Sequence, residues 1–351
     1  MRELDYMERV AYAYARALQS TDSTVWVNRR IPTDARVKWE QCLDIGCAPA
    51  LFGVKDTSQI SREMIDRLAK DPRFVWMSVD RMAPHGRAID PELVNPLTGR
   101  RMTGSTSGGP VNILRGIHDL AIGTDGGGSI LGPAIATQLV GINGKGLGLV
   151  GRQPSKSTDG YPLTVGIGAI SHTFALARDA IEVLLGRPLS GRSEGLRIAL
   201  DEAAPRGALA TLNQHFAKVE SFSKQGAFQR EVGIKLLESL FEHSDVVVSY
   251  EGPVDVDAYS DSLATGQHVD DRGGKFLLRC ANIVNATAVA IPDEHPARGF
   301  VVMAPEGYQH ACNALSVAES LAAQSSKTDL YEDYFIRRMR VEHSGFFHLE
   351  V

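Results

Sequence analysis

The sequence has few cysteines, no long apolar run and no excess of basic charge, and each absence excludes a class of protein. Four cysteines in 351 residues are too few for a disulfide framework, and Cys42 and Cys47 have no second close pair with which to bind zinc. We therefore expect reduced core thiols, no metal and a cytoplasmic protein. No apolar run approaches the roughly 20 residues that a membrane-spanning helix needs, and the charged N-terminal segment is unlike a signal peptide.

The charge balance argues against nucleic acid as a partner. The chain has 42 acidic and 37 basic residues, a net charge of −5, whereas binding phosphates requires a concentrated basic surface. The densest basic run, at residues 337–340, has acidic residues on both sides and is interpreted as a solvated face. We expect neither a nucleic acid nor a membrane as partner.

Helical and strand-like patterns alternate along the chain without a linker between them. Apolar spacing predicts helices at 4–18, 61–68, 174–185, 228–240 and 312–323, and β-rich runs predict strands at 74–79, 245–250, 286–291 and 300–303. Ser61 is the expected N-cap of its helix, and Gly186 is expected to end another. The pattern predicts one α/β domain over residues 1–351, with a mixed β-sheet core covered by helices on both faces. From about residue 325 the tail is polar, and its packing is left open.

Glycines are concentrated in the stretch most suited to approach a ligand closely. Of 34 glycines, 18 lie between Gly99 and Gly168, including the segments MTGSTSGG (102–109) and GTDGGGSILGPA (123–134). Gly126, Gly127 and Gly128 have no Cβ, so their N–H groups can approach a ligand, and beside Ser129 they could form an oxyanion hole. Structural turns or a phosphate-binding nest fit the same pattern.

Two nucleotide-binding motifs fit the glycine-rich stretch poorly. Lys145 follows a glycine but is itself followed by Gly146, which excludes a Walker loop. The glycine spacing at 144–151 has no convincing strand before it, as a dinucleotide fingerprint requires. No cofactor is therefore expected.

The two glycine segments resemble the amidase-signature core and the glycine–serine segment that precedes it. Residues 53–56, GVKD, are similar to the segment in which this family carries a lysine, and further similarities follow in order at 139–144, 168–173 and 282–292. The resemblance covers residues from about 45 to 320. It implies the amidase-signature fold and an unusually short member of this family of serine hydrolases.

The resemblance implies a Ser–cis-Ser–Lys triad, with Ser129 as nucleophile and Lys55 as base. Neutral lysine would take a proton from the middle hydroxyl, which in turn takes one from the nucleophile. Such a lysine needs its pKa lowered from about 10.4 to roughly 7–8 by burial. Gly126, Gly127 and Gly128 are the expected oxyanion hole.

The middle hydroxyl of the triad falls on Thr106 or on Ser105. Alignment on Gly108 and Gly109, which are expected to open a helix, gives Thr106, whereas counting back from Ser129 gives Ser105. We prefer Thr106 and keep Ser105 as the alternative. The resemblance also implies a non-proline cis peptide bond at this residue, which costs roughly 3–4 kcal/mol.

Other positions depart from the family or fall outside its catalytic set. Leu131 stands where the family commonly has arginine, so we expect no cation near the nucleophile, which would disfavour acidic substrates. Asp125 is expected to be a buried acceptor for loop amides. His118 and His172 are interpreted as structural.

The resemblance implies an amidase that cleaves a small-molecule carboxamide through an acyl-enzyme on Ser129. One alternative is an acyltransferase, in which an amine captures the same acyl-enzyme and an amide is formed or an amido group transferred. Another is a partner-dependent amidotransferase subunit, and a third is a non-catalytic scaffold. A homodimer is a possibility that rests on family habit alone.

Overall fold

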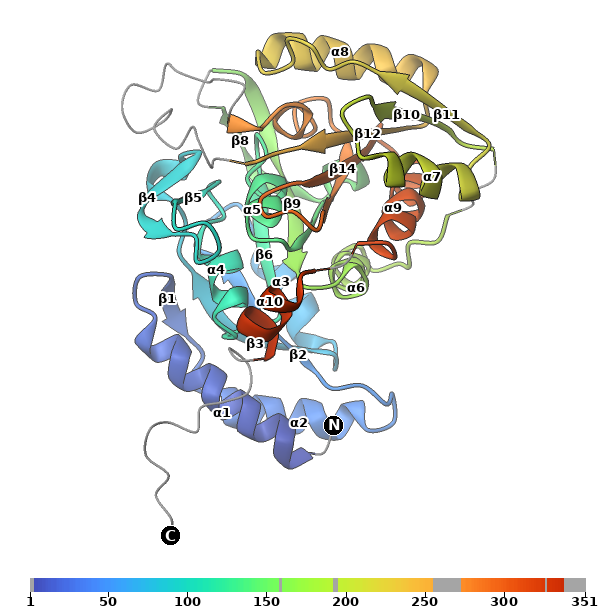
Figure 1. Ribbon diagram of the computed structural model, residues 1–351. Coiled ribbons are helices and arrows are strands. Elements are labelled where there is room, and N and C mark those ends of the chain that lie inside the picture. The colour runs from blue at the N-terminus through green and yellow to red at the C-terminus, as the bar shows by residue number, and fades with distance from the viewer. Residues whose placement is uncertain (1–2, 158–159, 192–194, 255–272, 326, 338–351) are drawn as a thin grey trace.

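The computed structural model describes residues 3–157, 160–191, 195–254, 273–325 and 327–337 (Figure 1). The helices are α1 (Glu3–Gln19), α2 (Ile31–Cys42), α3 (Arg62–Lys70), α4 (Gly108–Leu114), α5 (Leu131–Ala136), α6 (Phe174–Leu185), α7 (Arg206–His215), α8 (Arg230–His243), α9 (Tyr308–Ala322) and α10 (Asp329–Tyr331). The strands are β1 (Thr24–Val27), β2 (Ala50–Lys55), β3 (Phe74–Asp80), β4 (Ile89–Val94), β5 (Arg101–Thr103), β6 (Leu120–Asp125), β7 (Val140–Asn143), β8 (Val150–Lys156), β9 (Pro162–Ser171), β10 (Arg197–Asp201), β11 (Lys218–Phe222), β12 (Val246–Glu251), β13 (Thr287–Pro292) and β14 (Gly299–Ala304).

Twelve of these strands form one mixed sheet. Its order is β1-β3-β2-β6-β9-β7-β13-β14-β12-β10-β11, and β8 is added to the side of β9. Strands β3, β2 and β6 are parallel, as are β12, β10 and β11, while the strands between these two groups are antiparallel. Strands β4 and β5 form a separate hairpin. The expected mixed α/β sheet is therefore present.

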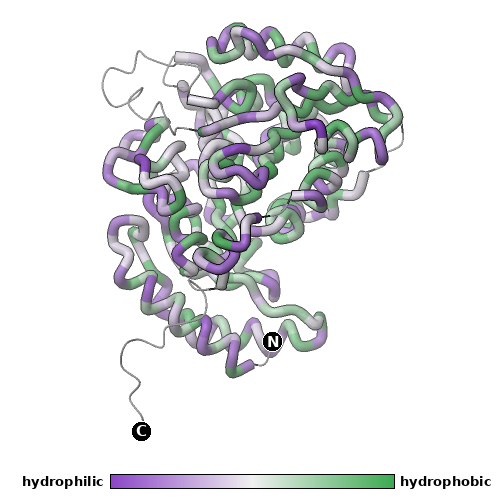
Figure 2. Tube along the Cα trace, viewed as in Figure 1, coloured by the Kyte–Doolittle hydropathy of each residue, from purple (hydrophilic) through white to green (hydrophobic). Residues whose placement is uncertain are grey.

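Helices cover both faces of this sheet because its central strands are apolar on both sides. In β13, Val289 and Ile291 belong to the core beneath α3, α6, α7 and α9, whereas Ala288 and Ala290 belong to the core beneath α4, α5 and α8. Helices α1 and α2 pack together on a third apolar cluster at the β1–β3 end of the sheet. Figure 2 shows hydrophobic colour along the central strands and alternating colours along the outer helices α1 and α8.

The helices and strands expected from the sequence are all found, with ends shifted by a few residues. Ser61 caps α3 by accepting a hydrogen bond from the N–H of Met64, and Gly186 ends α6 at a φ of +74°. Glycines 108 and 109 open α4, as expected. None of the helices in the described ranges is long and apolar enough to cross a membrane.

The first part of the polar tail, up to Phe335, packs against the rest of the protein. Tyr331 is buried, and its hydroxyl donates a hydrogen bond to the carbonyl oxygen of Thr137 at 2.9 Å. Phe335 lies in the same apolar cluster. Most of the basic run at 337–340 and the rest of the tail lie outside the described residues.

Candidate active site

Lys55 lies at the carboxyl end of β2, between the parallel strands β3 and β6. Its side chain is only 3% exposed, and Nζ lies 2.7 Å from Ser105 Oγ and 2.7 Å from Thr124 Oγ1. Burial lowers the pKa of Lys55 to about 7, and the nearby carboxylate of Asp125 partly opposes this shift. A large fraction of Lys55 is therefore neutral at physiological pH, as a general base requires.

Ser105, and not Thr106, is the hydroxyl that Lys55 contacts. The Thr106 hydroxyl instead donates to the backbone oxygen of Thr124 at 3.1 Å, and its methyl group lies against Gly123. This geometry reverses our preference for Thr106 and favours the alternative, Ser105.

The expected cis peptide bond is not found at this turn. Within the described ranges the one cis bond is Gly252–Pro253, so the bonds on either side of Ser105 are trans. The chain turns instead at Gly104, which has a φ of +74°. A Cβ on Gly104 would lie 2.4 Å from Pro133 and 3.3 Å from the Cα of Ser129, so glycine is required for the close approach of the two loops.

Ser129 lies on the loop between β6 and α5, beside Ser105. The backbone N–H of Ser105 donates to Ser129 Oγ at 3.1 Å. A donor in this position stabilises negative charge as it develops on the serine oxygen. Lys55, Ser105 and Ser129, from three distant parts of the sequence, are thus brought together.

Asp125 holds the loop that carries Ser129. Its fully buried carboxylate accepts hydrogen bonds from the N–H groups of Gly128 at 2.6 Å, Ile130 at 2.7 Å and Leu131 at 3.3 Å. Burial raises the pKa of Asp125, while these hydrogen bonds and Lys55 oppose the shift. The expectation that Asp125 accepts loop amides is confirmed.

The same hydrogen bonds restrict the oxyanion hole predicted from the glycines. The N–H of Gly128 already donates to Asp125 at 2.6 Å and is therefore engaged in that hydrogen bond. Gly126 and Gly127 line the pocket in front of Ser129 and are the remaining candidates among the three. The predicted set is thus reduced by one member.

A pocket of about 450 Å³ opens in front of these residues. Lys55, Ser105 and Ser129 line it together with side chains from β8, β9 and the segment before β4. A cavity of this size accommodates a small molecule.

The expectation that no cation lies near the nucleophile is wrong. Leu131 is fully buried and provides no charge, but Arg230, the first residue of α8, reaches the pocket. A Cβ built on Gly127 would lie 3.1 Å from a guanidinium nitrogen of Arg230. The cation therefore comes from a helix about a hundred residues further along the chain.

His118 lies beneath the site and not in it. Its Nε2 is 2.9 Å from Asp80 Oδ2, and both side chains are buried. A Cβ on Gly53 would meet both, so Gly53 makes room for this pair. This location agrees with a structural role.

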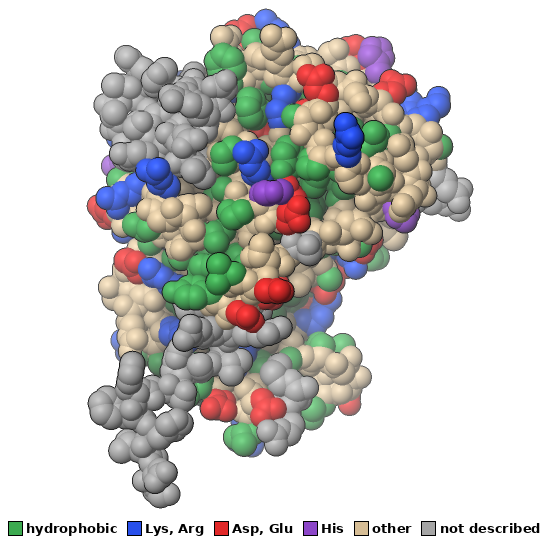
Figure 3. All heavy atoms as spheres, viewed as in Figure 1, with side chains coloured by type: hydrophobic (Ala, Val, Ile, Leu, Met, Phe, Trp, Pro, Cys, Tyr) green, Lys and Arg blue, Asp and Glu red, His purple; other side chains and the backbone are tan. Residues whose placement is uncertain are grey.

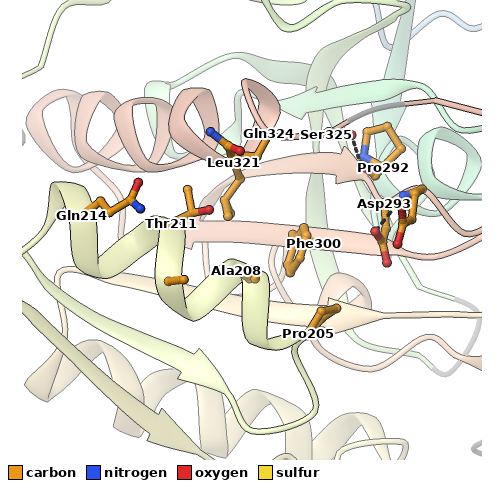
Figure 4. Close-up of a pocket in the computed structure, with 13 residues that line it drawn as sticks. Pro205, Ala208, Thr211, Gln214, Pro292, Asp293, Phe300, Leu321, Gln324 and Ser325 are labelled. Carbon is orange, nitrogen blue, oxygen red and sulfur yellow. Dashed lines mark hydrogen bonds between the residues drawn. The ribbon is translucent and has the colours of Figure 1, made fainter.

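A second cavity, of about 500 Å³, lies between α7, α9 and β14 (Figure 4). Thr211, Gln214, Phe300 and Asp293 line it, and no member of the Lys55–Ser105–Ser129 group does. At its edge, Asp293, Glu294 and His295 bring their ligand atoms within 4.8 Å of one another, the one such group in the described ranges. Two of the three are exposed, and nothing else at this place indicates a bound metal.

Solved structures resemble the chain over most of its length, and three of them illustrate the similarity. A crystal structure of an amidase shares 15% identity at a TM-score of 0.63, covering 92% of this chain and 96% of that one. A bacterial aryl acylamidase of the amidase-signature enzymes shares 16% sequence identity at a TM-score of 0.63, and the match covers 95% of both chains. The allophanate hydrolase of Kluyveromyces lactis shares 13% sequence identity at a TM-score of 0.63, and the match covers 91% of this chain and 70% of that one. The chain has the amidase-signature fold.

The sequence itself matches no family model and no curated protein. At 13–16% identity the neighbours establish the amidase-signature fold alone. The chemistry has to be argued from the residues in the pocket.

Two residues of the site were not anticipated from the sequence. Thr124, the second partner of Lys55, lies inside the GTDGGGS segment, and its hydroxyl could have been considered there. No local sequence pattern indicates that Arg230 belongs to the site, because it lies in an ordinary amphipathic helix whose position only the fold reveals.

On the face seen in Figure 3, acidic and basic side chains are interspersed.

Proposed function

We propose that this protein hydrolyses a small carboxamide through an acyl-enzyme on Ser129. The observation that carries the proposal is the buried Lys55 Nζ at 2.7 Å from Ser105 Oγ, with Ser105 in turn hydrogen-bonded to Ser129 Oγ through its N–H. The amidase-signature fold, shared with amidases, supports it.

In the first half-reaction, neutral Lys55 accepts the Ser105 proton while the Ser105 oxygen accepts the Ser129 proton. Ser129 Oγ attacks the amide carbon, and the N–H groups of Gly126 and Gly127 donate hydrogen bonds that stabilise the negative charge on the carbonyl oxygen. Collapse of the intermediate breaks the C–N bond, and the proton returns from Lys55 through Ser105 to the leaving nitrogen. The products of this half-reaction are an amine, or ammonia, and an acyl-enzyme.

Water completes the reaction. The same hydroxyl–lysine pair removes a proton from water as it attacks the acyl ester, and that proton ends on Ser129 when the carboxylic acid leaves. Asp125 holds the loop of Ser129 through three backbone hydrogen bonds, so we expect this loop to keep its position in both half-reactions.

The direct test is covalent labelling of the nucleophile. Wild type and Ser129→Ala are treated in parallel with a small fluorophosphonate, and intact mass is measured. One adduct on wild type and none on the variant would support an activated Ser129. An unlabelled wild type with a native circular dichroism spectrum would contradict the proposed function.

Ser105→Ala and Thr106→Val distinguish the two candidates for the bridging hydroxyl. Ser105→Ala should lower kcat/KM by roughly 10²–10⁴-fold, because it removes the proton carrier between Lys55 and Ser129. Thr106→Val removes only the hydrogen bond to the Thr124 carbonyl, so it should cost about 1 kcal/mol of stability and less than about tenfold in kcat/KM. Steady-state kinetics and thermal unfolding of both variants measure these effects. A larger kinetic loss in Thr106→Val would return the role to Thr106.

A further inference from the structure

The charged side chains that line the active-site pocket are all basic in the part of the chain that the structure describes. They are Lys55, Arg87, Lys156 and Arg230, and no aspartate or glutamate of the described ranges lines the pocket. The chain as a whole has a net charge of −5. The positive lining is therefore a local property of the pocket.

Arg230 is the deepest of the three permanently charged side chains. It is partly buried, and its guanidinium lies against the backbone of Gly127, two residues before the nucleophile. A guanidinium is charged at all accessible pH values and presents a planar set of donors that fits a carboxylate. At this place it can contact a group attached to the acyl chain of a substrate bound at Ser129.

Arg87 and Lys156 are exposed at the mouth of the same pocket. Cations on the walls of a cleft raise the local concentration of an anionic substrate and its rate of association. Their exposure makes them suited to attraction and not to tight binding.

Apolar side chains also line the pocket, beside Gly126. Leu163 and Val165 of β9 line it, and a Cβ on Gly126 would lie 3.4 Å from Leu163 Cδ1. An apolar wall of this kind favours a short aliphatic segment over a polar one. The pocket thus combines a reactive serine, an apolar wall beside Gly126 and a cation beside Gly127.

From this combination, and from the position of Arg230 two residues before the nucleophile, we propose that the substrate is a monoamide of a short dicarboxylic acid, whose free carboxylate binds Arg230. This inference rests on the proposed function for its choice of an amide, but its charge requirement is independent of turnover. It also reverses the disadvantage for acidic substrates expected from Leu131.

Binding to Ser129→Ala tests the inference without hydrolysis. Calorimetry compares succinamate with 4-oxopentanamide, a neutral compound of similar shape in which a methyl ketone replaces the carboxylate. Succinamate should bind at least about tenfold more tightly, since hydrogen bonds to a charged group contribute more than neutral ones. Its affinity should fall with added salt, while that of the neutral compound should not.

Variants of Arg230 in the same background assign the effect. Arg230→Gln should remove the preference for succinamate, and Arg230→Lys should keep part of it because the charge remains without the planar fork. Arg206→Gln is the matched control, because Arg206 is the first residue of α7 and does not line the pocket. It should leave the preference unchanged.

Three results would overturn the inference: equal affinity for the two compounds, an Arg230→Gln variant that retains the full preference, or tighter binding of N-butanoylglycine than of succinamate. The last would place the carboxylate on the leaving group. Failure of the proposed function is a separate observation, because fluorophosphonate labelling of Ser129 involves no carboxylate. Arg230-dependent binding of succinamate with no labelling would leave the carboxylate site standing and remove the hydrolase.

Discussion

Ser129→Ala is expected to lower kcat/KM by at least about 10⁴-fold, measured with an amide that the wild-type protein hydrolyses. Removing a nucleophile leaves only the catalysis that the rest of the site provides, because no acyl-enzyme can form. The structural change is small: one oxygen atom and one hydrogen bond, from the N–H of Ser105, are lost. The melting temperature should therefore stay close to that of wild type.

Ser239→Ala is the control for this experiment. Ser239 is an exposed serine in α8, and its replacement should change kcat/KM less than about twofold. A loss smaller than tenfold in Ser129→Ala, in a folded protein, would remove Ser129 from the mechanism. A large loss accompanied by unfolding would instead be a structural effect, which the melting temperature detects.

Local signals were enough to predict the ranges of five of the ten helices and four of the fourteen strands in the described ranges. The Ser61 N-cap and the Gly186 terminus were readable because each depends on a few neighbouring residues. The order of strands could not be predicted, because the paired residues of β2 and β6 are 68 apart in the sequence and those of β13 and β7 are more than 140 apart. The helix α2 was among those missed, since its apolar positions are few and it begins with Ile31 and a proline.

Site residues that lie in a continuous motif could be predicted from the sequence, whereas those whose role depends on the direction of a side chain or backbone group could not. Asp125 and Ser129 lie in one segment, and Lys55 lies in a short one of its own. Choosing between Ser105 and Thr106 depends on which side chain the turn at Gly104 directs toward Lys55, and two ways of counting residues gave two answers. The involvement of Gly128 in a hydrogen bond to Asp125 was likewise invisible before the backbone conformation was known.

Lys55→Met is expected to lower kcat/KM by about 10³-fold or more, since the general base is removed from both half-reactions. In wild type, kcat/KM should rise about tenfold per pH unit below an apparent pKa near 7 and level off above it, because only neutral Lys55 can accept the proton. A steady-state pH profile measures this. A profile that stays flat from pH 5 to 9 would contradict Lys55 as the base.

The same substitution should remove the cost of a buried ammonium at low pH, and this gain in stability relative to wild type should disappear at high pH. Burial lowers the Lys55 pKa from 10.5 to about 7 in the folded state, so below pH 7 both states carry the proton and the folded state bears the full cost of a buried ammonium. That cost is on the order of 5 kcal/mol, at 1.36 kcal/mol for each pKa unit. From pH 7 to 10.5 the unfolded state still binds the proton and the folded state does not, so wild-type stability rises with pH.

Urea denaturation of wild type and Lys55→Met at pH 6 and pH 10 measures this linkage. The loss of hydrogen bonds to Ser105 and Thr124 costs Lys55→Met a similar amount at both pH values, so the change in the difference between the two proteins with pH reports the buried charge alone. Lys235→Met, in an exposed pair with Glu231, is the control and should show no such change. A pH-independent difference for Lys55→Met would mean that Lys55 keeps its proton in the folded protein up to pH 10. Since an ammonium cannot accept the Ser105 proton, that result would also exclude the proton transfer on which the acyl-enzyme mechanism depends.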